Sequence, residues 1–270
     1  MKILYFGGGL GNQIFEYAFY LTLKEKFPND KILGVLLDRK FKEHAGGFEI
    51  ERIFDVCYPK HSNLGLLLMI FIMFFNKYIK ETSFYCHNLT TPNWKAFLFN
   101  AHKMNIEFYG NRKDWLRFRH ICLNKQNAEI KHIMENSNSV SVHVRRGDFL
   151  SPQYATNHAN IATLDYYKKA FDCVNSKFQY VKYFVFSDDI EWCKDNLGLI
   201  DAIYIDWNKG SESYIDMYLM TFSKANIIAN STFSYWGAYL NKSNKVTIYP
   251  KKWETSEGDI NIFPSTWIGL

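Results

Sequence analysis

The chain contains 270 residues, 47% of them hydrophobic and 18% aromatic, and its net charge is +5. This length and apolar content allow a large core, so they exclude global disorder and suit two domains. The mild positive charge, without a dense basic run, favours an anionic small molecule or an acidic membrane surface as partner. It argues against a nucleic-acid binder.

Cysteine and histidine spacing indicates neither a disulfide framework nor a metal site. The five cysteines are widely spaced and form no Cys-x-x-Cys pair, and the eight histidines show no metal-ligand spacing. We therefore expect reduced thiols in a cytoplasmic protein. The first six residues lack the plan of a signal peptide and continue directly into a predicted strand.

The first half opens with a strand, a glycine-rich loop and a helix. Residues 2–6 predict the strand, residues 7–13 the loop, and apolar spacing predicts a helix from Ile14 to about Lys26; a second strand is predicted at 32–37. This order is typical of a nucleotide-binding unit. The glycine pattern is incomplete, however, and no Walker lysine follows, so the loop better indicates a backbone that approaches something closely.

The most apolar run of the chain is Leu64–Phe75. Its twelve residues are too few to span a bilayer, which needs about 20. It predicts either a buried helix or a helix lying on a membrane face, and the second case would bring the protein to the inner face of the membrane. Elsewhere between 39 and 138 the pattern is poor, with one or two amphipathic turns within 46–54, a strand predicted at 106–109 and a helix at 128–135.

A polar break at 136–139 separates this region from a regular second half, so we expect domains at 1–138 and 139–270. Predicted strands and helices then alternate, which implies a parallel, doubly wound sheet. The strands are 140–144, 181–186, 202–205, 226–229 and 246–249, and the helices are 164–174, 190–197, 214–224 and 233–240. The predicted fold is α/β, with two Rossmann-like domains facing each other across a cleft, where small-molecule sites tend to occur.

The central stretch 141–148 (SVHVRRGD) predicts a strand that ends in a tight turn carrying Arg145 and Arg146. In open α/β sheets, ligands bind at the carboxyl ends of the strands. Arginine forks match phosphate oxygens bidentately, so one interpretation is a turn that binds a diphosphate. The alternative is a strand end whose arginines pair with surface carboxylates.

Two further strand ends present polar side chains, 187–189 (SDD) and 231–234 (STFS). In a doubly wound sheet these ends converge on one rim, where hydroxyls and a helix amino terminus would favour a phosphate. The alternative for both is helix capping. Together the three ends predict a nucleotide-diphosphate pocket. Because no Asp-x-Asp occurs, the paired arginines would take the electrostatic role of a divalent ion.

Several stretches resemble the bacterial and animal α-1,2-fucosyltransferases, glycosyltransferase family 11, and run in family order over nearly the whole chain. They are 8–13 (GGLGNQ), 47–54 (GFEIERIF), 143–149 (HVRRGDF), 164–167 (LDYY), 186–189 (FSDD) with Trp192, and 227–238 (IIANSTFSYWGA). The resemblance implies a GT-B architecture, GDP-fucose as donor, a terminal galactoside as acceptor, and inverting α-1,2 transfer without a cofactor or metal. It makes 1–138 the acceptor-side domain and 139–270 the GDP-fucose-binding domain.

The resemblance also assigns roles to individual residues. Arg145 and Arg146 would hold the diphosphate, and His143 and Asp188 would contact the guanosine. The phosphate side would be lined by Ser231, Thr232, Phe233 and Ser234. The loop containing Gly9, Gly11, Asn12 and Gln13 would meet the donor–acceptor junction from across the cleft.

An inverting transfer calls for a base that takes the proton of the acceptor hydroxyl. Asp148 is the first candidate because it is close in sequence to the arginines, and His158, in the loop 153–163, is the second. The alternative role of Asp148 is to orient an arginine, and an oxocarbenium-like route with a weak base is also open.

The chain departs from the family pattern at two places. Ser223 and Ala225 stand where cysteine and histidine are common. The pair 111–112 (NR) stands where an aromatic residue and glutamine are usual, which puts the identity of the acceptor in doubt. A glycan- or nucleotide-binding protein without catalysis is the alternative function, although the complete HxRRxD element argues against it. The preferred galactoside and the oligomeric state are not predicted.

Overall fold

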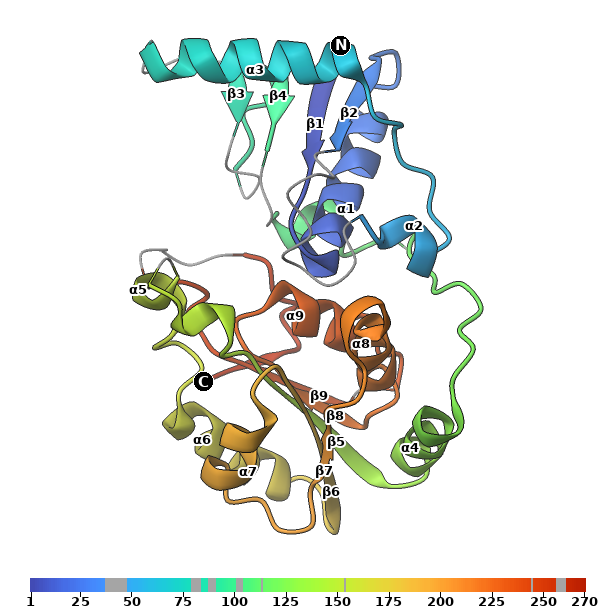
Figure 1. Cartoon of the computed structure of the whole chain (residues 1–270), viewed down its shortest axis with the longest axis vertical. Helices are drawn as coiled ribbons and strands as arrows, with labels where there is room; N and C mark the ends of the chain where they lie inside the picture. The colour runs from blue at the N-terminus through green and yellow to red at the C-terminus, as the bar shows by residue number, and fades with distance from the viewer. Residues whose placement is uncertain are drawn as a thin grey trace. The chain divides into compact units, whose positions relative to one another are not determined.

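The computed structural model describes residues 1–36, 48–78, 84–86, 91–100, 104–112, 114–152, 154–243, 245–255 and 261–270. Of the segments predicted above, Leu37, Gly46, Gly47 and Gln153 lie outside these ranges. The chain divides into two compact units (Figure 1): Met1–Ile121 with Asn261–Pro264, and Cys122–Ile260 with Ser265–Leu270. Each unit is built on a parallel sheet, which confirms the predicted α/β class. The predicted cleft between two facing domains stays a prediction.

The boundary between the units lies at Ile121, not at residue 138 as the polar break predicted. Helix α4 (Lys125–Glu135) explains the difference. Its apolar face, with Ile130 and Met134, packs against the sheet of the second unit. Asn124 caps the helix by accepting a hydrogen bond from the N–H of Asn127 at 2.8 Å. The polar break is therefore the turn between this helix and the next strand.

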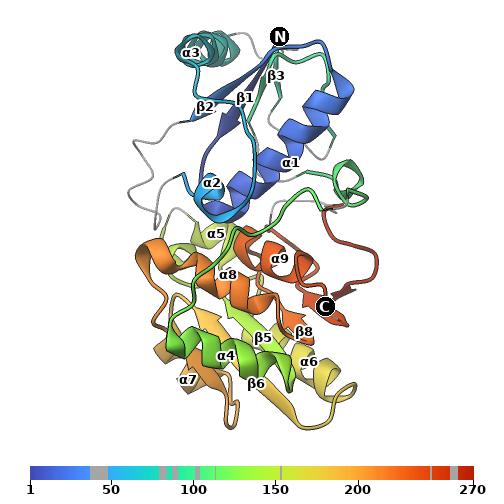
Figure 2. The ribbon, with the colours of Figure 1, turned by 90° about the vertical axis from the view of Figure 1, so that its right-hand side faces the viewer.

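The first unit is a four-stranded parallel sheet in the order β2-β1-β4-β3. Figure 2 shows α1 and α3 on opposite faces of this sheet. Its elements are β1 (Lys2–Phe6), α1 (Leu10–Lys26), β2 (Ile32–Leu36), α2 (Ile50–Ile53), α3 (Asn63–Tyr78), β3 (Tyr85–Cys86), β4 (Leu98–Phe99) and the 3₁₀ turn η2 (Ile106–Phe108).

The strand predicted at 106–109 is wrong, because the structure has the turn η2 there. The side chain of Asn105 accepts a hydrogen bond from the N–H of Glu107 at 3.0 Å, which satisfies a backbone donor locally. Tyr109 ends the turn and is fully buried, where it donates to the carbonyl of Ile262. Of the apolar residues in this segment, Tyr109 is thus buried from the end of a turn, while Ile106 and Phe108 are half-buried.

The second unit is a six-stranded parallel sheet in the order β10-β9-β8-β5-β6-β7. Besides α4, its elements are β5 (Asn138–Val144), η3 (Asp148–Leu150), α5 (Ala155–His158), α6 (Leu164–Asn175), β6 (Val181–Ser187), α7 (Ile190–Asn196), β7 (Ile203–Ile205), η4 (Gly210–Glu212), α8 (Tyr214–Met220), β8 (Ala225–Ile227), α9 (Thr232–Tyr239), β9 (Val246–Tyr249) and β10 (Ile268–Gly269). The predicted alternation of strands and helices is confirmed.

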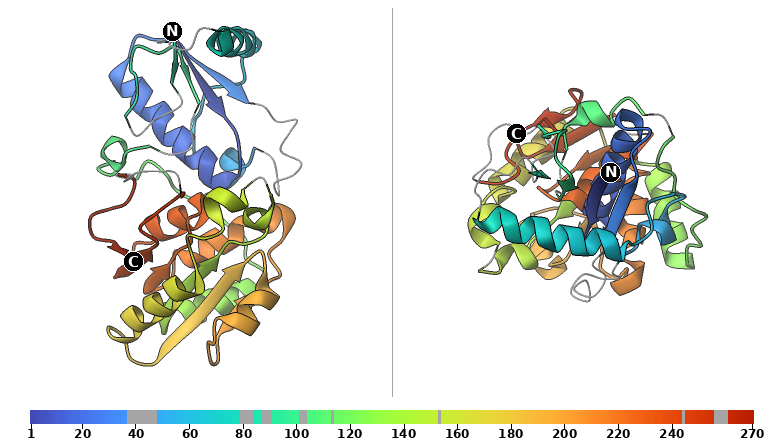
Figure 3. Two further views of the ribbon diagram at one scale, coloured as in Figure 1. Left: turned by 90° about the vertical axis from the view of Figure 1, so that its left-hand side faces the viewer. Right: turned by 90° about the horizontal axis from the view of Figure 1, so that it is seen from above.

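Helices cover both faces of the second sheet, as the alternation of side chains along its strands requires. On β6, Tyr183 and Val185 face a cluster formed with α6 and α7. Phe184 and Phe186 face the opposite cluster, formed with α4 and α8. The left panel of Figure 3 shows α6 and α7 along one side of this sheet.

Candidate functional site

The carboxyl ends of β5, β6 and β8 are neighbours in the second sheet, because β5 pairs with β6 on one side and β8 on the other. The structure therefore brings together the three strand ends that the sequence singled out. Two buried tyrosines of α6 hold this rim in place. Tyr167 donates its hydroxyl to the carbonyl of His143 at 2.9 Å, and Tyr166 donates to that of Ile228 at 2.6 Å.

Three carboxylates surround the two arginines that follow β5. Nε of Arg145 donates to Asp148 at 2.8 Å, and its Nη1 lies 3.2 Å from Asp188. Nε of Arg146 donates to Asp189 at 3.0 Å. Burial opposes the charge of Arg145, but the hydrogen bond to Asp148 and the nearby charges of Asp188 and Asp148 outweigh it and raise its pKa. The pairing with carboxylates is thus observed, and the binding of a diphosphate stays a prediction.

Asp188 and Gly147 fix the shape of this turn. One oxygen of Asp188 accepts a hydrogen bond from the backbone N–H of Arg146 at 2.9 Å, and the other forms the ion pair with Arg145. A Cβ at position 147 would lie 2.9 Å from that second oxygen, which is too close. The glycine is therefore required by the approach of the carboxylate. The predicted contact of Asp188 with guanosine stays a prediction.

Arg146 also rests on an aromatic ring that sequence reasoning did not select for the site. Its guanidinium carbon lies 3.8 Å from the centre of the Trp192 ring. Asp189 caps α7 by accepting from the N–H of Trp192, so one helix end supplies both the ring and the carboxylate. In the sequence, the spacing of Asp189 and Trp192 in the first turn of α7 was the signal that could have indicated the role of this ring. Within the described part of the chain, no hydrogen bond engages the two terminal nitrogens of Arg146, which leaves them for a ligand.

His143 is buried beneath this turn and is neutral. Its side chain contacts Phe233, with ring centres 5.8 Å apart. Burial, and secondarily the charge of Arg145, lower the pKa of His143 to about 3. Its Nδ1 is buried and makes no hydrogen bond with the described residues, which is uncommon for a buried polar atom.

The segment 231–234 begins α9, and its side chains differ in how they are used. Ser231 stands at the cap position, but its side chain makes no capping hydrogen bond, so the capping alternative is not observed for it. Thr232 and Phe233 are half-buried at the helix start. Ser234 is fully buried and donates to the carbonyls of Ser231 and Ala229. Its predicted place on the phosphate side stays a prediction.

The two candidate bases have different surroundings. Asp148 holds Arg145, as its alternative role predicted, and is about one-third exposed. His158 stacks on Phe149, with ring centres 4.7 Å apart, and its Nδ1 is buried without a hydrogen bond in the described structure. Asn230 donates to the carbonyl of His158 at 3.3 Å and so ties this segment to the end of β8.

The glycine loop of the first unit is held by buried side chains. Gln13 is almost fully buried. Its amide nitrogen donates to Gly8 at 2.9 Å, and its oxygen accepts from the N–H groups of Glu49 and Ile50, which begin α2. Gly8 has a φ of +75°, a conformation that favours glycine. At Gly9, by contrast, a Cβ would meet no atom within 4 Å.

The predicted donor-binding residues of this loop therefore have different surroundings. The side chain of Gln13 joins the loop to α2 within the first unit. Gly11 is buried and Asn12 is half-buried in the first turn of α1. That these residues meet a donor stays a prediction.

Among the described residues, no group of three or more histidine, cysteine, aspartate or glutamate side chains is arranged to hold a metal ion. Whether the reaction needs a metal is a question for experiment, and metal independence stays a prediction.

Comparison with known proteins decides the family. The profile of glycosyl transferase family 11 matches residues 68–270, most of the chain. The chain belongs to glycosyltransferase family 11. The O-antigen biosynthesis glycosyltransferase WbnK of Escherichia coli is 30% identical, and the match covers 97% of this chain and 98% of that protein. An alpha-1,2-colitosyltransferase of Escherichia coli is 32% identical over 97% of this chain and 96% of its own.

More distant matches agree with this family. The galactoside alpha-(1,2)-fucosyltransferase 1 of Saimiri boliviensis boliviensis is 29% identical, but the match covers only 37% of this chain and 28% of that protein. Among solved structures, POFUT1 in complex with GDP matches with a TM-score of 0.51 at 12% identity, covering 93% of this chain and 99% of the other. This second likeness concerns the fold alone.

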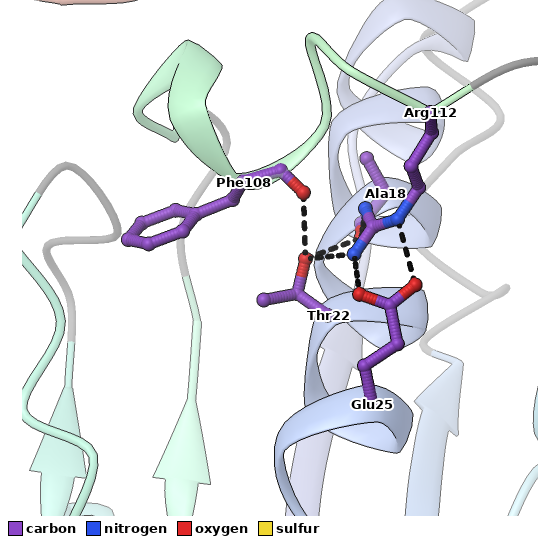
Figure 4. A network of polar contacts seen from close by, with 5 residues as sticks. All are labelled: Ala18, Thr22, Glu25, Phe108 and Arg112. Atoms are coloured by element: carbon purple, nitrogen blue, oxygen red, sulfur yellow. Dashed lines mark hydrogen bonds and ion pairs between the residues drawn. The ribbon is translucent and has the colours of Figure 1, made fainter.

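The structure accounts for one place where this family 11 chain departs from the expected pattern, Arg112. Figure 4 shows its guanidinium against α1, where it pairs bidentately with Glu25 at 3.0 and 2.6 Å. It also donates to the hydroxyl of Thr22 and the carbonyl of Ala18. Thr22 in turn donates to the carbonyl of Phe108. Arg112 therefore fastens the segment after η2 to α1.

The other departure from the family pattern, at 223 and 225, lies inside the second unit. The hydroxyl of Ser223 donates to the carbonyl of Met220 at 2.9 Å, and Asn241 donates to the carbonyl of Ser223 at 2.7 Å. Ala225 is fully buried on β8. Ser223 is thus a satisfied polar residue of the core.

Proposed function

We propose that this chain is a galactoside α-1,2-fucosyltransferase. It moves L-fucose from GDP-fucose to the 2-hydroxyl of a terminal galactoside, with inversion and without a metal. One observation carries the proposal: in a family 11 chain, the turn after β5 presents two arginines on the rim of a parallel sheet, with the terminal nitrogens of Arg146 available to an anion. The curated relatives named for α-1,2 transfer of colitose and fucose support the linkage.

In this proposal the arginines stabilise the leaving group. Negative charge accumulates on the β-phosphate as the bond to the sugar breaks, and preorganised cations lower the energy of that state. Each charge-assisted hydrogen bond contributes about 1.5–3 kcal/mol. The ion pairs with Asp148, Asp188 and Asp189 keep both guanidiniums in place before the donor arrives, so no reorganisation is required during the reaction.

The proposed step is a direct displacement at the anomeric carbon. The galactoside 2-oxygen forms a bond to C1 of fucose while the bond from C1 to the phosphate oxygen breaks, and its electron pair leaves with GDP. The proton of the hydroxyl passes to a base. Asp148 is our first candidate and His158 the second, with an oxocarbenium-like route as the alternative.

The remaining donor contacts follow from the positions around the turn. We assign the guanosine to His143 and Asp188 and the phosphate side to Ser231, Thr232 and Phe233. Because His143 is neutral, it would recognise the base by hydrogen bonding or stacking, without charge. The acceptor side is assigned to the first unit with its loop of Gly9, Gly11, Asn12 and Gln13. We also propose that the protein acts in the cytoplasm.

The test is incubation of the chain with GDP-fucose and a panel of galactosides that includes lactose, with and without EDTA. Release of GDP together with a product whose fucose is α-1,2-linked supports the proposal. Arg146→Ala should abolish donor use. Wild-type activity of that variant, or activity that depends on added magnesium or manganese, would overturn the diphosphate role of the arginines.

Asp148→Asn separates the base from an orienting role. If Asp148 is the base, turnover at saturating donor falls far more than GDP affinity. If GDP binding collapses while residual turnover stays normal, Asp148 only orients Arg145.

Colitose is a second candidate sugar, favoured by the full-length relative named as a colitosyltransferase. Colitose is the 3-deoxy analogue of fucose, so the two donors differ by one hydroxyl. A site that hydrogen-bonds this hydroxyl rejects the deoxy sugar strongly, whereas one that does not discriminates weakly. The ratio of kcat/KM for the two GDP-sugars decides between them. Binding of GDP without transfer of either sugar would support the non-catalytic alternative.

A further inference from the structure

Helix α3 buries only one of its sides. Gly65 and Met69 are buried, and Met69 packs on the sheet of the first unit against Ile3, Val35 and Leu98. The helix was expected to be either a core helix or one lying on a membrane face. In the structure, α3 is a surface helix. The right panel of Figure 3 shows it from the side, over its whole length. Among the helices described, none is long and apolar enough to cross a bilayer.

The outward side of α3 is almost entirely apolar. Leu67 is 66% exposed, and Phe71 and Phe74 are each 59% exposed. Their spacing of four and three residues places them on one helical stripe. The full set of exposed large side chains on this helix is Leu64, Leu67, Ile70, Phe71, Met73, Phe74 and Phe75. Soluble surfaces rarely carry such a continuous patch unless something binds there.

The charged residues nearest to this helix in the sequence are basic on both sides. The sequence has no charged residue from Ser62 to Asn76. Lys60 and His61 precede the helix, Lys77 lies in its last turn, and Lys80 follows it; the nearest acidic positions in the sequence are Asp55 and Glu81. An apolar helix face with basic residues at both ends matches an anionic lipid surface, where acyl chains receive the apolar side chains and head groups the lysines.

We propose that the outward face of α3 binds the surface of an anionic membrane, with the helix lying in the plane of the interface. This interaction goes beyond the proposed transferase activity and does not depend on it. A helix of 16 residues is about 24 Å long, so several apolar side chains enter the interface together.

A second copy of the chain is the competing occupant, and the charges argue against it. A two-fold contact is isologous, so residues of the patch would meet the same patch on the partner. Because both ends of α3 carry basic residues in the sequence, parallel and antiparallel pairing would each bring like charges together. An anionic membrane neutralises both ends instead.

Sedimentation of the full chain with vesicles tests this proposal. The vesicles are phosphatidylethanolamine with phosphatidylglycerol, or neutral phosphatidylcholine. We expect binding to the anionic vesicles, weakened about tenfold by Phe74→Asp because an apolar group is lost from the interface. Lys60→Ser should weaken binding about fivefold on anionic vesicles only. Ile200→Asp is the matched control: Ile200 is equally apolar and 87% exposed, but lies in the second unit, and its substitution should change nothing.

Because the exposed ring of Phe74 is not part of the core, Phe74→Asp should keep the circular dichroism spectrum and melting temperature of the native chain. Two results would overturn the proposal. One is absence of binding to anionic vesicles, or equal binding by the native chain and Phe74→Asp. The other is a dimer in sedimentation velocity that Phe74→Asp dissociates and that vesicles do not bind, which would make a second copy the occupant.

Discussion

The carboxylate of Asp188 accepts a hydrogen bond from the backbone N–H of Arg146 at 2.9 Å. This contact joins the end of β6 to the turn after β5. Since the other oxygen of the same carboxylate pairs with Arg145, one side chain orients both arginines. The electrostatic part of the proposed site thus rests on an aspartate as much as on the arginines.

Asp188→Asn keeps the size of the side chain but removes its charge. The amide oxygen can still accept from Arg146, whereas the attraction to Arg145 is lost. We expect GDP affinity to fall roughly tenfold, about 1.4 kcal/mol, measured by calorimetry. Asp165→Asn is the control, because Asp165 forms only an exposed pair with Lys169 and should leave affinity unchanged. Unaltered GDP binding by Asp188→Asn would contradict this account.

The regular part of the fold could be predicted because its signals are local. From β5 onward, apolar runs, caps and strand-end polar residues each lie within a few positions, and the predicted strands and helices are found there. Two-residue strands such as β3 and β4 carry no period of their own. They form by pairing, β4 with β1 and β3 with β4, and these partners are distant from β1 in the sequence. The domain boundary was misplaced for a similar reason, since the sequence of α4 does not reveal which sheet it covers.

In the candidate site, too, local features could be predicted and contacts between distant segments could not. Paired arginines at a strand end indicated an anion site directly. The ring of Trp192 beneath Arg146 did not follow from the sequence, because that contact joins segments separated by a whole α/β repeat. Likewise, the inward hydrogen bonds of Ser234 and Gln13 depend on backbone groups that only the folded chain brings close. Residue type predicted the chemistry, and burial decided which side chains remain available for it.

His143 should stay neutral across the physiological range. Its folded pKa of about 3 lies below the ordinary value of 6.5, so as pH falls the unfolded chain takes up a proton that the folded chain does not. This residue therefore lowers stability by about 1.4 kcal/mol per pH unit between 6.5 and the folded pKa.

Two measurements check this prediction. In NMR titrations from pH 8 to 5, the His143 ring signal should not move. In urea unfolding, His143→Gln should show a shallower loss of stability with acid. A His143 signal that titrates near 6.5 would contradict the assignment.

Arg112 should stabilise the first unit. Its substitution by alanine removes the bidentate ion pair with Glu25 and the hydrogen bonds to Thr22 and Ala18. The hydrogen bonds to Thr22 and Ala18 are partly buried. We expect a loss of about 2 kcal/mol. Hydrogen exchange of residues 18–26 should accelerate accordingly. Arg117→Ala is the matched control, because Arg117 makes a longer, exposed pair with Asp114 and should change stability by less than about 0.5 kcal/mol. Equal effects of the two variants would contradict the stabilising role of Arg112.

Asp216 gives the opposite pH dependence to His143. It accepts a hydrogen bond from Asn208 at 2.7 Å, in a network with Asn127 and Trp207. Burial raises the pKa of Asp216 to about 7 from an ordinary 3.8, and the hydrogen bond offsets only part of that. The folded chain thus holds a proton that the unfolded chain releases, so this residue's contribution is full below pH 3.8 and is lost as pH rises to about 7.

Asp216→Asn should remove this slope, which is about 1.4 kcal/mol per pH unit. The amide oxygen can still accept from Asn208, so the variant keeps this hydrogen bond at every pH. The expected result is therefore a change in how the free energy of unfolding depends on pH. Relative to the native chain, the variant gains stability steadily from pH 4 to pH 7 in urea unfolding. Parallel curves for the native chain and Asp216→Asn would mean that Asp216 is ionised in the folded protein over this range.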